Sequence, residues 1–131
     1  MPINSFRDLE VWQCSMELTR CVYRATGSMV WPHRHEIGAQ MRKAAVSTPS
    51  NVAEGFSQGA LGAYLRHVRI AAGSTAELET QAELATDMKL WVPDLAADVT
   101  RLAERSGQML TGLIRSLEAR ADRDGHPRHR R

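Results

Sequence analysis

The chain has little cysteine, no long apolar run and no targeting signal. Two cysteines occur in 131 residues, and Cys14 and Cys21 lie two turns apart on one predicted helix, about 10 Å, which is too far for a disulfide between them. No stretch approaches the roughly 20 consecutive apolar residues of a membrane-spanning helix, and no basic-then-apolar signal opens the chain. We therefore expect a soluble, cytoplasmic protein without membrane contact, in which both cysteines are small core residues.

The motifs of common catalytic and cofactor sites are also missing. No Glu-x-x-His pair is present for a di-iron centre, and neither a Walker loop nor a Gly-x-Ser-x-Gly elbow occurs. His33 and His35 are one residue apart and cannot share a helical face, so exposed histidines explain them better than a metal site does. Lys43 lies one turn from Ser47, but no convergent oxyanion donor accompanies that pair. We expect no enzymatic activity, no cofactor and no bound metal.

Apolar residues recur at steps of three and four in four stretches, which predicts helices near residues 5–27, 33–55, 60–89 and 93–120. Ser5 and Asp8 have capping-box spacing at the start of the first helix. In the last helix the seam runs through Leu102, Ser106, Met109 and Leu113, with Leu110 and Leu117 beside it. Four helices with short connections and no strand signal predict an all-α protein, an antiparallel up-and-down four-helix bundle.

The segment 40–55 combines helical periodicity with small side chains and one proline. Pro49 lacks the amide that would bond to the Ala45 carbonyl, so it either kinks the second helix or ends it, with Thr48 capping a new short helix. We favour the kink, because Gly55 leaves too few residues for a second helix. Small residues at 71–74 predict a further close helix crossing in the third helix.

Charge is balanced along the body of the chain and basic at its end. Residues 1–120 carry 13 basic and 13 acidic side chains, so the formal net charge of +2 comes from residues 121–131. We expect residues 1–120 to form the bundle and residues 121–131 to be a disordered basic tail.

Several short motifs follow one another in an order known from one protein family. They are Asp8-Leu9, Val11-Trp12, Glu17-Leu18, Val22-Tyr23, Arg42 to Gly55, Gly73-Ser74 and Glu77 to Gln81. In this order and spacing the chain resembles the bacterial four-helix-bundle family encoded in intervening sequences of large-subunit ribosomal RNA genes. Ile37-Gly38-Ala39 and Gln58 depart from the family pattern, which has an aromatic-Gly-Leu and a basic residue there.

The resemblance implies a homo-oligomer, specifically a pentameric ring. It also implies a relation to the accessory protein of diversity-generating retroelements, which works with a reverse transcriptase. We therefore expect a non-enzymatic scaffold or adaptor that binds RNA or DNA, or a nucleic-acid enzyme. The alternative is a protein-only assembly module that binds another polypeptide, which the neutral body of the chain favours.

Candidate residues follow for both kinds of contact. For nucleic acid they are basic side chains of the second and third helices and of the tail: Arg42, Lys43, Arg66, Arg69, Arg128, Arg130 and Arg131. No aromatic interleaving supports the stacking of single-stranded bases. For the oligomer interface they are large side chains beyond what a slim seam buries: Trp12, Tyr23, Trp31 and Trp91. The acidic residues of the third helix, Glu77, Glu79, Glu83 and Asp87, are either a solvated face or a socket for arginines of a neighbouring subunit.

Overall fold

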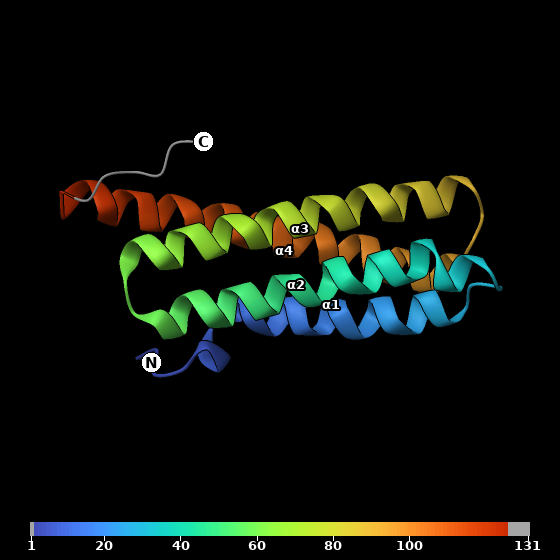
Figure 1. Cartoon of the computed structure of the whole chain (residues 1–131), viewed down its shortest axis with the longest axis horizontal. Coiled ribbons are helices and arrows are strands. Elements are labelled where there is room, and N and C mark those ends of the chain that lie inside the picture. Colours follow the sequence, from blue (N-terminus) through green and yellow to red (C-terminus); the bar gives the residue numbers. More distant parts are fainter. Residues whose placement is uncertain (1, 126–131) are drawn as a thin grey trace.

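Four long helices account for most of residues 2–125, the part of the chain that this computed structural model describes. They are α1 (Glu10–Gly27), α2 (Ile37–Gln58), α3 (Leu61–Asp87) and α4 (Pro93–Arg123), and the 3-10 turns η1 (Phe6–Asp8) and η2 (His33–His35) precede α1 and α2. Each helix packs against the next in sequence, and α4 also packs against α1 (Figure 1). No strand occurs among residues 2–125, so the prediction of an all-α four-helix protein is confirmed. Among residues 2–125, no helix has the combination of length and apolar composition that a membrane span requires.

The start of the first helix differs from its predicted position. Ser5 and Asp8 do form a capping box, in which the Ser5 hydroxyl accepts the Arg7 amide at 3.2 Å and the Asp8 carboxylate accepts the Ser5 amide at 3.1 Å. The box caps η1 alone, because Leu9 is extended and α1 begins after it. The second helix also starts late, at Ile37, after the η2 turn.

Two helices continue beyond their predicted ends. α2 passes Gly55 and stops at Gln58, where Gly59 takes a φ of +78°, a left-handed conformation that glycine adopts readily. α4 continues to Arg123 and buries Ala121, so the bundle includes the first residues of the predicted tail. The rest of that tail, residues 126–131, lies outside the described residues.

The core consists of two apolar clusters with a layer of hydroxyl groups between them. One cluster includes Leu18, Met41, Leu78 and Val99, and the other includes Val11, Val52, Val68 and Leu110. Between them each helix contributes one buried hydroxyl: Ser15, Thr48, Thr75 and Ser106. Thr75 donates to the Ala71 carbonyl at 2.9 Å and lies 3.0 Å from the Thr48 hydroxyl, while Ser106 lies 3.2 Å from the Cys14 sulfur. Because all four hydroxyls have partners, this layer fixes the register of the helices at modest cost.

Pro49 lies inside a continuous α2, so the chain does not break there. The Ala45 carbonyl that Pro49 leaves without its helical donor lies 3.1 Å from the Thr19 hydroxyl of α1. The same hydroxyl lies 2.8 Å from the Ser15 carbonyl, and its single proton serves both acceptors. A side chain of the neighbouring helix therefore compensates for the amide that proline lacks.

α2 and α3 approach each other closely at Gly55. A Cβ at this position would lie 2.7 Å from the Cβ of His67 and 3.3 Å from the Cα of Tyr64. The predicted close crossing at residues 71–74 is only partly present. Ser74 contacts Ser47 at 2.7 Å, whereas Gly73 is exposed and a Cβ there would meet nothing within 4 Å.

Candidate functional site: nucleic-acid and oligomer interfaces

Arg42 is held by the fold and does not point freely into solvent. Its guanidinium donates to the Thr26 hydroxyl at 3.0 Å and to the Arg34 carbonyl at 3.1 Å, and it lies 5.9 Å from the centroid of the Tyr23 ring. These contacts tie the start of α2 to the end of α1. The neighbouring Lys43 is exposed.

The four predicted basic residues of α2 and α3 do not form one patch. Asn51 bonds to His67, which places the middle of α2 level with Arg66 and Arg69. Arg42 lies nine residues earlier on α2, about 14 Å along the helix axis. The structure therefore separates Arg42 and Lys43 from Arg66 and Arg69.

Arg66 and Arg69 lie instead where α3 begins and α4 ends (Figure 1). Arg69 forms an ion pair of 2.6 Å with Glu118 of α4, and Arg66 is exposed. Arg120 and Arg123 of α4 are also exposed. We call Arg66, Arg69, Arg120 and Arg123 the cationic end. The tail arginines Arg128, Arg130 and Arg131 follow it in sequence but lie outside the described residues.

Arg120 of α4 acts electrostatically on Tyr64 in the first turn of α3. Burial raises the pKa of the Tyr64 hydroxyl above its usual range, and the positive charge of Arg120 partly opposes that rise. Arg120 and Arg123 were not among the residues predicted from the sequence to contact nucleic acid. The signal was available, because antiparallel neighbours bring the end of one helix beside the start of the other.

His67 does not belong to the basic group, although it lies between Arg66 and Arg69 in sequence. It is 6% exposed and faces α2, where its Nδ1 lies 2.9 Å from the Asn51 Oδ1 and its Nε2 lies 3.2 Å from the Gln58 Nε2. The Asn51 amide nitrogen donates to the Ser47 carbonyl at 2.9 Å, which leaves its oxygen to accept from Nδ1. His67 is therefore a packing residue of the α2–α3 contact.

The four large side chains predicted for an oligomer interface fall into two classes. Trp91 is 7% exposed and donates to the Thr86 hydroxyl at 3.1 Å, and Trp12 is half-buried and packs against Phe6 with 5.3 Å between ring centroids. Tyr23 and Trp31, by contrast, are 53% and 71% exposed. The single chain therefore leaves only the latter two largely open to a partner.

Tyr23 and Trp31 belong to a wider exposed apolar surface at the end of the bundle opposite the cationic end. The 28–32 and 88–92 connections meet there, where the Val92 amide donates to the Ser28 hydroxyl at 3.2 Å. The exposed apolar side chains of this end, which we call the apolar cap, are Tyr23, Val30, Trp31, Leu84, Met88 and Val92. Large exposed apolar patches are typical of interaction sites, which makes the apolar cap a candidate interface.

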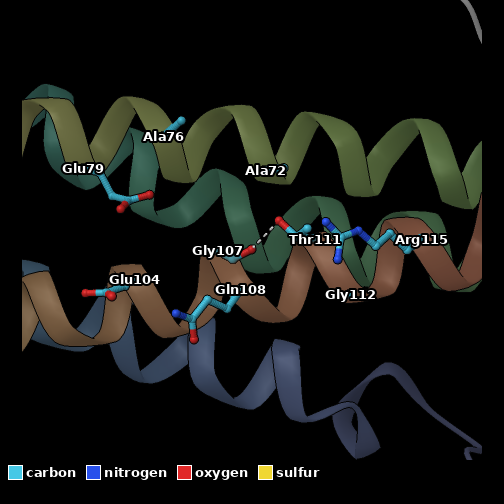
Figure 2. Close-up of a pocket in the computed structure, with 9 residues that line it drawn as sticks. All are labelled: Ala72, Ala76, Glu79, Glu104, Gly107, Gln108, Thr111, Gly112 and Arg115. Atoms are coloured by element: carbon cyan, nitrogen blue, oxygen red, sulfur yellow. Dashed lines mark hydrogen bonds between the residues drawn. The ribbon is translucent and has the colours of Figure 1, made fainter.

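An open groove of about 570 Å³ runs between α3 and α4. Figure 2 shows Glu79 and Glu104 toward one end of it and Arg115 at the other, with the small residues Ala72, Ala76, Gly107 and Gly112 between them. Burial, and then the neighbouring Glu104, raise the pKa of the Glu79 carboxyl above its usual range. Of the four predicted acidic residues of α3, Glu79 is thus the one that lines a groove, while Glu77 accepts a hydrogen bond of 3.3 Å from Gln81.

Four packed helices place the chain among the helical-bundle proteins. The family model described as 23S rRNA-intervening sequence protein matches residues 7–112, and the chain belongs to this family. A comparison with curated proteins finds no match.

Proposed function

We propose that the protein is a non-enzymatic, homo-oligomeric scaffold that binds RNA or DNA without sequence specificity. The observation that carries this proposal is the cationic end, where Arg66, Arg120 and Arg123 are exposed beside the helix terminus from which the arginine-rich tail continues. Exposed guanidinium groups bind phosphate through charge-assisted hydrogen bonds and read no base edges. The proposed site thus shifts from Arg42 toward the end of α4.

The scaffold we propose is an antiparallel, up-and-down bundle in which Pro49 kinks α2. The short α2–α3 connection at residues 59–60 favours the antiparallel arrangement, and the Thr19 hydroxyl near the freed Ala45 carbonyl favours a kink stabilised by α1. The family resemblance favours a cytoplasmic pentamer that works with a reverse transcriptase. A ring multiplies the cationic end, so individually weak phosphate contacts sum to useful avidity.

Titration of labelled RNA and DNA at two salt concentrations tests this function. We expect Arg66→Ala with Arg120→Ala, and separately a truncation after Gly125, to weaken binding and to lower its salt dependence by about one unit of log–log slope per lost phosphate contact. Arg34→Ala with Arg105→Ala is the matched control, because both side chains are exposed, form no ion pair within residues 2–125 and lie away from the cationic end. Arg69 is left intact, since its removal would leave Glu118 without its partner. Absence of binding by the wild type at low salt would reject the proposal.

The apolar cap favours a second candidate, a protein-only assembly module that binds another polypeptide. Trp31 and Met88 are 71% and 64% exposed, and such side chains are typical anchors of protein interfaces. The two candidates differ in their response to salt, because apolar contacts do not weaken as salt rises whereas phosphate contacts do. A partner retained at high salt and lost in Trp31→Ser would support the module.

A further inference from the structure

One exposed stripe of α4 has an unusual order of charges. Its residues recur at steps of three and four and so lie along one side of the helix: Arg101, Glu104, Gln108, Thr111, Arg115 and Glu118. All are exposed except the half-buried Glu118. Read from either end, the stripe places two charges, then two neutral polar residues, then two charges.

The stripe is complementary to itself only when reversed. If a second α4 runs antiparallel, about a two-fold axis midway between Gln108 and Thr111, each residue meets its chemical complement. Glu104 then faces Arg115 of the second copy, Arg101 faces Glu118, and Gln108 faces Thr111. A parallel copy in register would place every charge against the same charge, which is unfavourable. Between two copies of this chain, the order of charges therefore favours the antiparallel arrangement of α4 over the parallel one.

The inner pair is the one whose charges are not already engaged in an ion pair within residues 2–125. Arg101 already lies 3.5 Å from Asp98, and Glu118 lies 2.6 Å from Arg69. Glu104 and Arg115, in contrast, form no ion pair within residues 2–125. Glu79 places a second carboxylate beside Glu104 at the acidic end of the α3–α4 groove, and this like-charge neighbour makes a cation favourable there.

Next to the centre of the stripe, Gly112 is exposed and leaves the helix backbone accessible, whereas Gly107 faces Thr75 and Glu79 of α3. Gly107 and Gly112 both line the groove within α4 (Figure 2). A Cβ at Gly112 would meet nothing within 4 Å, so the packing of one chain does not require glycine there. Glycine weakens a helix relative to alanine. Close approach of a second helix gives Gly112 a purpose that the single chain does not.

We propose that α4 pairs with α4 of a second copy in an antiparallel, two-fold contact centred between Gln108 and Thr111. This contact specifies one interface of the proposed homo-oligomer and rests on that proposal. Because a two-fold contact closes after two copies, it joins two chains or two rings and does not itself build a ring.

Charge reversal tests the contact. The quantity measured is the dissociation constant of the two-fold association step, by sedimentation equilibrium in the absence of nucleic acid. Glu104→Arg alone and Arg115→Glu alone each turn two attractive pairs into repulsive ones, and we expect each to weaken association by at least about tenfold. The two substitutions in one chain restore opposite charges across the axis, so that variant regains an affinity within about threefold of wild type. An equimolar mixture of the two single variants associates as well. Unaffected single variants, or a double variant as weak as either single one, would overturn the proposal.

A steric substitution provides an independent test that does not depend on charge. Gly112→Leu fills open space in the single chain, so we expect an unchanged or higher melting temperature together with loss of the two-fold step. Gly62→Leu is the matched control, because a Cβ there also meets nothing within 4 Å and it lies in the first turn of α3. Association that survives Gly112→Leu would contradict the contact. Because these experiments contain no nucleic acid, a negative result would not bear on the proposed nucleic-acid binding. If Gly112→Leu abolishes the two-fold step while other assembly is retained, the α4 contact is separate from the remaining interfaces of the oligomer.

Discussion

Gly55→Ala adds one methyl group where α2 and α3 lie in close contact. The new carbon would lie 2.7 Å from the Cβ of His67, which is fixed to the backbone and cannot rotate away, so α3 must shift. Such overpacking costs about 1–3 kcal/mol. The shift also stretches the 2.9 Å bond between His67 and Asn51, worth about 1 kcal/mol. Alanine returns about 1 kcal/mol through its higher helix propensity, so we expect a net loss of about 2 kcal/mol.

Gly73→Ala is the matched comparison, because the same substitution there meets nothing within 4 Å. We expect this variant to gain about 1 kcal/mol, so that the two variants differ by about 3 kcal/mol, or about 10 °C in melting temperature. Urea and thermal unfolding followed by circular dichroism, at one chain concentration, measure both. Equal stabilisation by the two substitutions would refute the steric account of Gly55.

Three further predictions concern single side chains. Thr19→Val removes the donor near the Ala45 carbonyl and should lower the free energy of unfolding in urea by about 1 kcal/mol. The same substitution should cost little in a Pro49→Ala background, because residue 49 then supplies its own amide to this carbonyl. An equal cost in both backgrounds would contradict this role of Thr19. Glu79 has a raised pKa in the folded chain, so its contribution to stability is fully present below the usual pKa of 4.5 and is lost as pH rises through the folded value. Glu79→Gln should therefore unfold at a higher urea concentration than wild type at pH 7, and this difference should shrink on acidification. A difference that does not change with pH would contradict the raised pKa of Glu79. Trp31→Ser should leave chain stability within about 0.5 kcal/mol but shift sedimentation toward smaller species, and unchanged assembly would remove Trp31 from the interface.

Most of the buried face of each helix could be predicted from periodicity alone. In α2 the stripe through Met41, Ala44, Thr48 and Val52 is buried as its spacing indicates. In the second half of α4 the predicted seam is displaced, since Met109 is half-buried while Leu110 is fully buried. A straight helix has 3.6 residues per turn, so a seam drawn at steps of three and four drifts across its face over several turns.

The candidate site was harder to predict, because side-chain partners come from connections that carry no periodic signal. Arg42 has the sequence character of a phosphate-binding residue, yet its partners are Thr26 at the end of α1 and the carbonyl of Arg34 in the η2 turn. Trp91 lies in a short connection between helices and is buried there. The order of charges along α4 can be read from the sequence, but only the structure shows that these side chains are exposed and therefore open to contact with a second copy.

The salt dependence of nucleic-acid binding tests the central claim most directly. A plot of the logarithm of the association constant against the logarithm of salt concentration, for the full chain with duplex DNA, has a slope of about −0.9 for each phosphate contact. With contributions from several copies of the cationic end, we predict a slope steeper than about −3, similar for unrelated sequences, and reduced by Arg66→Ala with Arg120→Ala. A slope near zero, or no binding at low salt, would contradict the proposed function.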